Sequence, residues 1–169
     1  KIKINGANEE HLRPVIEKLK ECGVVFSDYK NDSVIVDGRY PKKPLDIKTL
    51  PYPGFPTDMQ PQMMSLLSIV EGVSVITETV FENRFMHVAE LNRMGANIKI
   101  DGRIAIIEGI TKFTGCQVKA TDLRAGAAMI LSGLVAEGET EISDIYHIDR
   151  GYDGLVDKLC NLGADIKRI

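Results

Sequence analysis

The sequence is short of several features that would place it in familiar classes of protein. It has no stretch of about 18 apolar residues, so we expect no membrane-spanning helix. Its 21 basic residues form no run and are outnumbered by 24 acidic ones, whereas a nucleic-acid-binding protein usually shows a basic stripe. The three cysteines (Cys22, Cys116 and Cys160) have no metal-binding or redox spacing, and their odd number argues against a disulfide scaffold. We therefore expect a reducing, cytoplasmic setting.

What the sequence does contain is an internal repeat. A helix-ending glycine recurs at nearly equal intervals, at Gly23, Gly95 and Gly163, each four residues after a leucine. A second pattern, Thr-Asp before a long and nearly uncharged segment that ends in Glu-Gly, spans 57–72 and again 121–138. An internal period indicates that one supersecondary unit has been copied.

Each copy combines three kinds of element. Spacings of i, i+3, i+4 and i+7 between apolar residues predict amphipathic helices, at 11–22, 85–94 and 154–162. β-like runs, two of them reached by hairpin turns at 30–32 and 101–102, lie at 1–4, 24–26, 34–36, 73–77, 97–100, 104–107, 140–143 and 165–169. No charged residue lies between Asp58 and Glu71 or between Arg124 and Glu137, which predicts helices that are buried on all sides.

Helices of this uncharged kind have to lie inside the molecule. An ordinary two-layer α/β sandwich leaves no obvious place for two of them, whereas strands outside and helices inside satisfy the pattern. The sequence therefore predicts an α/β (α+β) fold of repeated βαβαββ-like units, with buried helices and outer sheets.

The repeat also bears on the extent of the domain. A chain of 169 residues with 44% hydrophobic content can bury a sizeable core, and we expect one domain over 1–169. Counting back from Gly23 by the interval between Gly72 and Gly95 reaches a position just before Lys1. We therefore expect the first unit's buried helix to lie upstream. The 169-residue piece should then be accompanied by the rest of its chain, or else self-associate through the apolar faces left uncovered or be poorly stable.

Two aspartates stand at equivalent places in the repeat. Asp58 lies where the first uncharged helix begins, because Pro61 is harmless only in a first helical turn. Asp is a favoured N-cap residue, so capping is one role for Asp58 and for Asp122. The other role is a carboxylate that faces a cleft and handles a substrate hydroxyl. The Pro-Gly-Phe-Pro lead-in at 53–56, which a cap does not need, favours this second role for Asp58.

Arg84 and Arg150 also occupy matching positions. Each follows a strand and opens an expected amphipathic helix, where a cation opposes the helix dipole. Arginine binds carboxylate or phosphate at two points, so the repeated placement indicates a bound anion. The alternative is that each pairs with its neighbour, Glu82 or Asp149. Among the other titratable candidates, we expect His87 and His147 at the surface or at strand ends and Cys116 to be packed, none of them with a chemical role.

Four longer segments carry a close resemblance to a known family. They are Tyr-Pro-Gly-Phe-Pro-Thr-Asp-Met-Gln at 52–60, Thr-Glu-Thr-Val-Phe-Glu-Asn-Arg-Phe-Met-His at 77–87, Ala-Thr-Asp-Leu-Arg-Ala at 120–125 and Tyr-His-Ile-Asp-Arg-Gly-Tyr at 146–152. In this order they resemble the enolpyruvyl transferases, and among these the enzymes that act on UDP-N-acetylglucosamine. The resemblance covers the chain end to end, although the chain is less than half of such an enzyme.

The resemblance implies a fold and an activity. The fold is an inside-out α/β barrel of two similar domains with three units each, so the chain would be most of one domain, without the lid-bearing domain. The reaction moves the enolpyruvyl group of phosphoenolpyruvate to the sugar 3-hydroxyl and releases phosphate, at the start of peptidoglycan synthesis. It requires neither a metal nor an organic cofactor.

The resemblance also implies roles for individual residues. It assigns contact with the 3-hydroxyl and the role of base to Asp58, the UDP-sugar pocket to Val80 and Phe81, and the phosphoenolpyruvate site to Arg84, Arg124, Arg150 and Asp122. The family's general-acid cysteine lies on the lid loop of the other domain, and no segment here matches that loop. We therefore expect the chain alone to be inactive.

Three alternatives remain beside this interpretation. Enolpyruvyl transfer to shikimate 3-phosphate shares the fold and the reaction, but the stretch at 81–87 resembles the UDP-sugar enzymes specifically. RNA-terminal phosphate cyclases are built from related units, and the acidic balance argues against them. A non-catalytic structural half is the third alternative.

Overall fold

The computed structural model of the chain describes residues 1–30 and 32–169, so the turn expected at 30–32 lies partly outside the described residues. The first unit contains β1 (Ile2–Asn5), α1 (Glu9–Glu21), β2 (Val25–Lys30) and β3 (Ser33–Asp37). The second contains β4 (Asp46–Lys48), the 3-10 helix η1 (Thr57–Met59), α2 (Gln60–Leu67), β5 (Val73–Thr77), α3 (Val88–Arg93), β6 (Asn97–Asp101) and β7 (Ile104–Glu108). The third contains β8 (Gln117–Lys119), α4 (Leu123–Gly133), β9 (Glu141–Ser143), α5 (Tyr146–Asp149) and α6 (Leu155–Asn161).

The internal repeat is confirmed by the backbone. Gly23, Gly95 and Gly163 follow the equivalent helices α1, α3 and α6 with φ angles of 104°, 94° and 93°. Gly72 and Gly138, which follow the α2 and α4 segments, have φ angles of 112° and 90°. Glycine adopts this left-handed region without a steric penalty, which makes it the usual residue just past a helix end.

The strands of the described residues form three sheets. Their orders are β1-β3-β2, β4-β5-β7-β6 and β8-β9. In the first unit β3 is antiparallel to β1 and β2, as β7 is to β5 and β6 in the second. β4 is parallel to β5, and β8 is parallel to β9. A parallel pair needs a crossover connection, and here α2 and α4 provide it.

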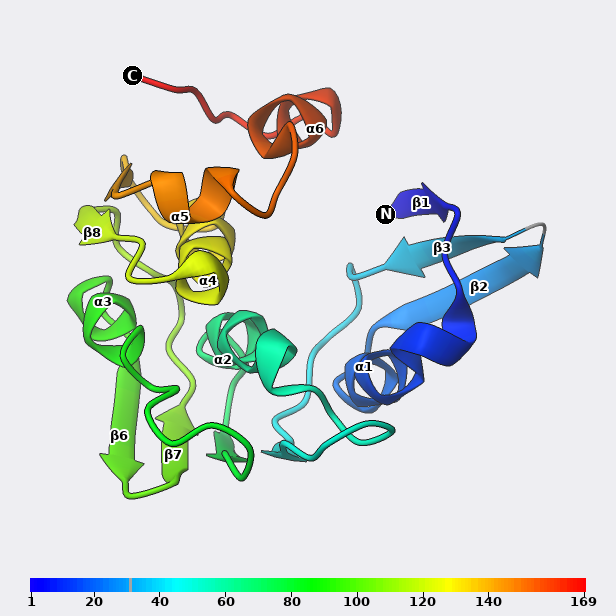
Figure 1. The fold of residues 1–169 in the computed structure, drawn as a ribbon, viewed down its shortest axis with the longest axis horizontal. Helices are drawn as coiled ribbons and strands as arrows, with labels where there is room; N and C mark the ends of the chain where they lie inside the picture. Colours follow the sequence, from blue (N-terminus) through cyan, green and yellow to red (C-terminus); the bar gives the residue numbers. More distant parts are fainter. Residues whose placement is uncertain (31) are drawn as a thin grey trace.

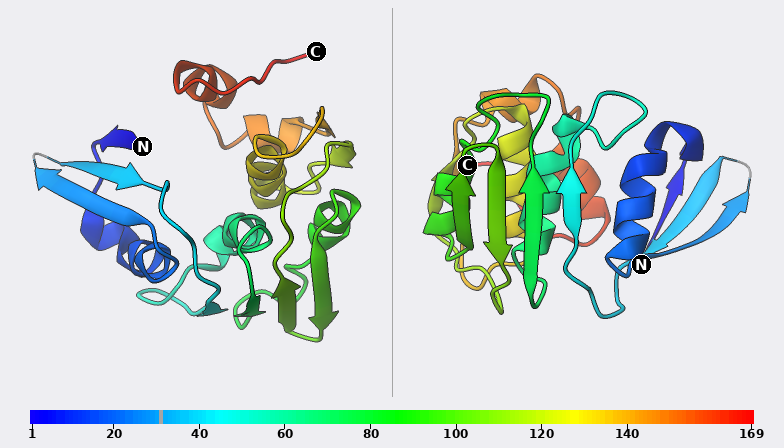
Figure 2. Two further views of the ribbon diagram at one scale, coloured as in Figure 1. Left: turned by 180° about the vertical axis from the view of Figure 1, so that it is seen from behind. Right: turned by 90° about the horizontal axis from the view of Figure 1, so that it is seen from below.

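The two crossover helices lie inside the molecule, as the sequence predicts. α2 and α4 pack on each other, and the four-stranded sheet covers them from outside (Figures 1 and 2). The Ser65 and Ser132 hydroxyls lie 2.6 Å apart across the contact between these helices. The buried residues of α4 are almost all small or apolar: Ala125, Gly126, Ala127, Ala128, Met129, Ile130 and Ser132.

Some expected boundaries and one expected strand differ from the structure. The second amphipathic helix begins at Val88 rather than at residue 85, because residues 82–87 form turns. Residues 164–169 form no strand, which contradicts the run expected at 165–169. The equivalent strands β2 and β6 are each held by a hairpin partner, whereas residues 165–169 pair with no strand in the described part of the chain.

Residues 1–30 and 32–169 lack two features that would indicate a membrane protein or a metalloprotein. No helix among them is long and apolar enough to span a membrane. No group of three or more His, Cys, Asp or Glu side chains among them is placed to hold a metal ion.

Candidate functional site

Asp58 does not cap a helix. The residue before η1 is Pro56, and no side chain makes a cap hydrogen bond there. The Asp58 carboxylate instead accepts from two arginines: Oδ1 from Arg84 Nη2 at 3.0 Å and Oδ2 from Arg124 Nη2 at 2.7 Å. Its side chain remains 52% exposed. The carboxylate is therefore fixed between two cations and open to solvent, which leaves it within reach of a substrate.

The Pro-Gly-Phe-Pro segment holds the start of η1 in place. Phe55 is buried in the main core, and its carbonyl accepts from the backbone N of Leu50 at 2.9 Å. Gly54 N donates to the carbonyl of Pro51 at 2.8 Å, which closes the turn before it. The lead-in that the sequence singled out thus anchors the loop that presents Asp58.

Arg84 is held on three sides. Its Nη2 bonds Asp58, and its Nε donates to Thr57 Oγ1 at 3.1 Å. Its guanidinium carbon lies 4.5 Å from the centroid of the Phe81 ring, a cation–π arrangement. The side chain is only 10% exposed. Pairing with the neighbouring Glu82 is excluded as its main contact, because Glu82 binds Arg103 instead.

Asp122 and Arg124 place the second buried helix against the same point. Asp122 is the N-cap of α4, and its Oδ1 accepts from the backbone N of Arg124 at 2.7 Å and of Ala125 at 2.9 Å. Capping is therefore the observed contact of Asp122, in contrast to Asp58. The hydrogen bond to Asp58 raises the pKa of Arg124. Both aspartates stand at helix starts that face the carboxyl ends of parallel strands, where α/β sheets commonly bind ligands.

Arg150 lies outside this network. It is the C-cap of the short helix α5 rather than the first residue of a helix, so its charge does not oppose the helix dipole as expected. It is exposed and makes no ion pair among the described residues. Asp149 does not pair with it either, since Asp149 binds Arg168. The structure thus joins Asp58, Arg84 and Arg124 in one network of ion pairs, in which Arg150 takes no part among the described residues.

Val80 and Phe81 lie on the loop after β5. Their side chains are half exposed, at 44% and 51%. Their backbone N–H groups both donate to Glu78 Oε1, at 2.8 and 2.9 Å. Glu78 itself is buried and was not singled out from the sequence. Burial works to raise the pKa of this carboxyl, but the hydrogen bonds it accepts lower the pKa overall.

His87 is buried, which corrects the expectation that it lies at the surface. It is 1% exposed, and burial lowers its pKa to about 4, although Asp122 and the backbone carbonyl of Arg84 act in the opposite direction. Its Nε2 has no hydrogen-bond partner among the described residues. The ring is therefore neutral at pH 7, and it lies between the backbone of Arg84 and the charge of Asp122.

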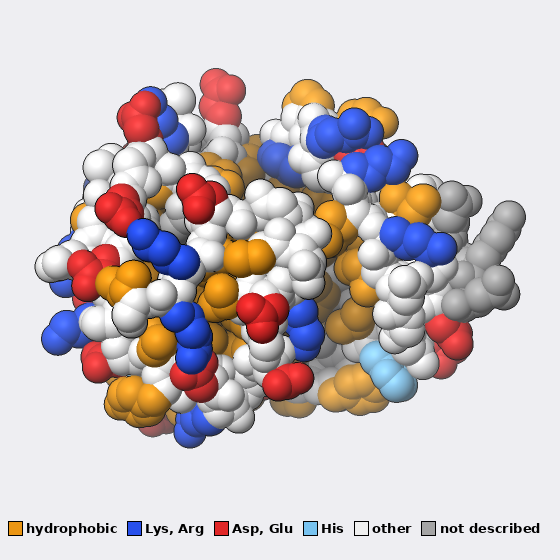
Figure 3. All heavy atoms as spheres, turned by 90° about the horizontal axis from the view of Figure 1, so that it is seen from above, with side chains coloured by type: hydrophobic (Ala, Val, Ile, Leu, Met, Phe, Trp, Pro, Cys, Tyr) orange, Lys and Arg blue, Asp and Glu red, His pale blue; other side chains and the backbone are white. Residues whose placement is uncertain are grey.

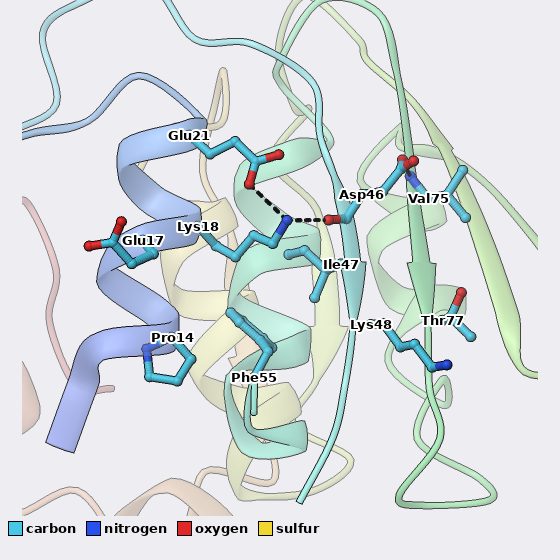
Figure 4. A pocket seen from close by; sticks show the side chains of 10 residues that line it. All are labelled: Pro14, Glu17, Lys18, Glu21, Asp46, Ile47, Lys48, Phe55, Val75 and Thr77. Atoms are coloured by element: carbon cyan, nitrogen blue, oxygen red, sulfur yellow. Dashed lines mark hydrogen bonds and ion pairs between the residues drawn. The ribbon is translucent and has the colours of Figure 1, made fainter. Parts of the chain in front are cut away.

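A separate hollow lies away from this network. A cavity of about 540 Å³ opens between α1 and β4, where Lys18 Nζ bonds both Glu21 and the carbonyl of Asp46 (Figure 4). None of the candidate residues lines it. On the face seen in Figure 3, acidic and basic side chains are interspersed over much of the surface.

Comparison with known proteins identifies the family. The model of the family described as EPSP synthase (3-phosphoshikimate 1-carboxyvinyltransferase) matches residues 1–159. The chain belongs to this family. The resemblance to enolpyruvyl transferases is thereby confirmed, as is the α/β fold of the enolpyruvyl transferase type.

Two curated relatives are similar to this chain over nearly its whole length. The chain is 65% identical over 169 residues to UDP-N-acetylglucosamine 1-carboxyvinyltransferase 2 of Clostridium tetani, covering 100% of this chain and 40% of the relative. It is 65% identical over 170 residues to UDP-N-acetylglucosamine 1-carboxyvinyltransferase 1 of Clostridium perfringens, covering 99% and 40%. The chain thus spans about 40% of the length of these curated relatives.

Solved structures agree. The enolpyruvyl transferase NikO from Streptomyces tendae has a TM-score of 0.87 and 31% identity, covering 98% of this chain and 39% of that one. EPSP synthase from Acinetobacter baumannii has a TM-score of 0.65 and 21% identity, covering 89% and 39%, and supports the fold alone.

Proposed function

We propose that this chain is part of an enzyme that transfers the enolpyruvyl group of phosphoenolpyruvate to the 3-hydroxyl of UDP-N-acetylglucosamine and releases phosphate. This would be the first committed step of peptidoglycan synthesis. The names of the two relatives that are 65% identical support this substrate pair over shikimate 3-phosphate. The three cysteines are free, which fits a cytoplasmic enzyme.

The observation that carries the proposal is the position of Asp58. A carboxylate that is held by Arg84 and Arg124 and is still half exposed can accept the proton of a sugar hydroxyl. A sugar hydroxyl is a poor nucleophile, and a positioned base contributes about 10²–10⁴-fold to such a reaction. Val80 and Phe81, on the loop that follows β5, would line the sugar pocket.

The arginines would serve the second substrate. Phosphoenolpyruvate carries a carboxylate and a phosphate, and fixed cations both bind these groups and stabilise the charge that develops during transfer. An anionic group that binds Arg124 competes with Asp58 for the same guanidinium, which would free one carboxylate oxygen for the sugar hydroxyl. Arg150 and Asp122 complete the proposed set. Arg150 is exposed and makes no ion pair among the described residues, which leaves its charge available to an anion.

A phosphate-release assay tests the proposal. The full-length protein that carries this chain is incubated with phosphoenolpyruvate and UDP-N-acetylglucosamine, with phosphoenolpyruvate and shikimate 3-phosphate, and with phosphoenolpyruvate alone. We expect release only with the UDP-sugar. Release only with shikimate 3-phosphate would show the sibling activity instead. No release with either acceptor would favour a non-catalytic structural role. The 169-residue chain alone should release no phosphate.

A further inference from the structure

The carboxylate of Glu78 is buried and accepts hydrogen bonds from four donors. Its Oε1 accepts from Thr49 Oγ1 at 2.8 Å and from the backbone N of Val80 and Phe81. Its Oε2 accepts from Thr57 Oγ1 at 2.8 Å. These donors come from the end of β4, from η1 and from the loop after β5. One side chain therefore joins three segments of the chain, among them η1, which carries Asp58.

The direction of these bonds matters for Arg84. The Thr57 hydroxyl gives its proton to Glu78, so its oxygen has lone pairs available for Arg84 Nε–H at 3.1 Å. Arg84 in turn donates to Asp58. A continuous chain of hydrogen bonds thus runs from the buried Glu78 carboxylate through the Thr57 hydroxyl and the Arg84 guanidinium to the half-exposed Asp58.

We propose that Glu78 is a positioning residue for the Arg84–Asp58 pair, acting through the hydroxyl of Thr57. The inference rests on the proposed function only for its kinetic consequences. Glu78 touches no substrate in this scheme. Glu78 orients the Thr57 hydroxyl, and this hydroxyl positions the Arg84 guanidinium. Arg84 in turn binds one carboxylate oxygen of Asp58, the proposed base.

The substitution Glu78→Gln separates this role from a general loosening of the loop. The backbone N–H groups of Val80 and Phe81 are fixed donors, so the amide oxygen of Gln takes their bonds and the amide NH₂ faces Thr57. The Thr57 hydroxyl then has to accept from that NH₂, and its proton loses the acceptor that Glu78 provides. The loop keeps its anchor, whereas the contact with Arg84 is weakened.

Kinetics on the full-length protein give the first readout. We expect Glu78→Gln to lower kcat about tenfold, the effect of losing roughly one hydrogen bond to a charged group. The KM for UDP-N-acetylglucosamine should change less than about twofold, because the Val80 and Phe81 anchor remains. Thr57→Val should give the same split, and adding Glu78→Gln to Thr57→Val should reduce kcat little further. Glu82→Gln is the matched control: Glu82 lies on the same loop with its side chain 84% exposed.

The second readout does not depend on activity. The ¹H–¹⁵N cross-peak of Arg84 Nε, identified by its loss in Arg84→Lys, reports the hydrogen bond to Thr57. We expect this peak to shift or broaden in Glu78→Gln and in Thr57→Val and to be unchanged in Glu82→Gln. An unchanged peak together with an unchanged kcat in Glu78→Gln would overturn the inference. If the wild-type protein shows no turnover, the proposed function fails, and the cross-peak alone still decides the role of Glu78.

Discussion

Asp58 and Arg124, which stand at the starts of the buried helical segments of two different copies of the repeat, are joined by a hydrogen bond of 2.7 Å between Arg124 Nη2 and Asp58 Oδ2. Their helices also touch along their length, since α2 packs on α4. The charged site is therefore built where two buried helices start side by side. No local motif encodes it, because the two residues meet only when the copies stack.

Replacing Asp58 by Asn in the full-length protein tests its chemical role. The amide keeps most of the contact with a sugar hydroxyl but cannot take its proton. We expect kcat to fall by about 10²–10⁴-fold, with a much smaller change in the KM for UDP-N-acetylglucosamine. Steady-state kinetics measure both values. Asp157→Asn, an exposed aspartate on α6, is the control. Since Asp58 caps no helix, near-normal kcat would reduce it to an organiser of the two arginines.

The repeat made much of this architecture predictable from the sequence. The glycines after each helix placed the helix ends, and the nearly uncharged segments at 57–72 and 121–138 placed the buried pair of helices. The same symmetry predicted that Asp58 and Asp122 lie at helix starts, but it did not predict that their contacts differ. Asp122 has free backbone N–H groups to cap, whereas the donors nearest the Asp58 carboxylate are arginine side chains.

What the sequence did not reveal depends on contacts between distant segments. In the sequence, Glu78 is an ordinary acidic residue after a strand. Its burial and its hydrogen bonds depend on Thr49 and Thr57, which only the fold brings next to it. His87 falls in a stretch with no helical period, so its burial left no pattern. Arg150 was assigned by symmetry with Arg84, but α5, which precedes it, places it at a helix end.

The stability of the protein should depend on pH through His87. Its folded-state pKa of about 4 lies below the unfolded value of 6.5, so the unfolded chain binds more protons between these values. The contribution is fully present above pH 6.5 and is lost as the pH falls toward 4. At pH 4.5 the loss amounts to about 2.5 kcal/mol.

Urea denaturation at pH 7 and pH 4.5 measures this loss. We expect His87→Gln, which can still donate to the Arg84 carbonyl, to be less stable than wild type at pH 7 but to lose about 2.5 kcal/mol less on acidification. His11→Gln, which changes an exposed histidine on α1, is the matched control. Equal acid sensitivity in wild type and His87→Gln would show that other groups dominate.

Gly109 sits where no side chain fits. A Cβ there would lie 1.8 Å from the carbonyl oxygen of Val70, at the end of the α2 segment, and backbone cannot easily move aside. We expect Gly109→Ala to lower the free energy of unfolding by about 3 kcal/mol, the upper end of the cost of overpacking. At Gly38 a Cβ would meet nothing within 4 Å, so Gly38→Ala should change stability by less than about 0.5 kcal/mol. Similar denaturation midpoints for the two variants would contradict the close approach.

The hydroxyl pair between the buried helices should behave as one unit. Ser65 and Ser132 are both buried, and Ser65 Oγ also donates to the carbonyl of Ala128 at 3.3 Å. Ser65→Ala removes the side-chain partner of the buried Ser132 hydroxyl, and we expect it to cost about 1–3 kcal/mol. Ser132→Ala should cost less, because the Ser65 hydroxyl keeps the carbonyl of Ala128 as its acceptor. The double variant removes both polar groups and should cost no more than the worse single variant. Urea denaturation of the four proteins gives the coupling energy, and strictly additive losses would mean that the two hydroxyls act independently and that water or backbone satisfies each of them.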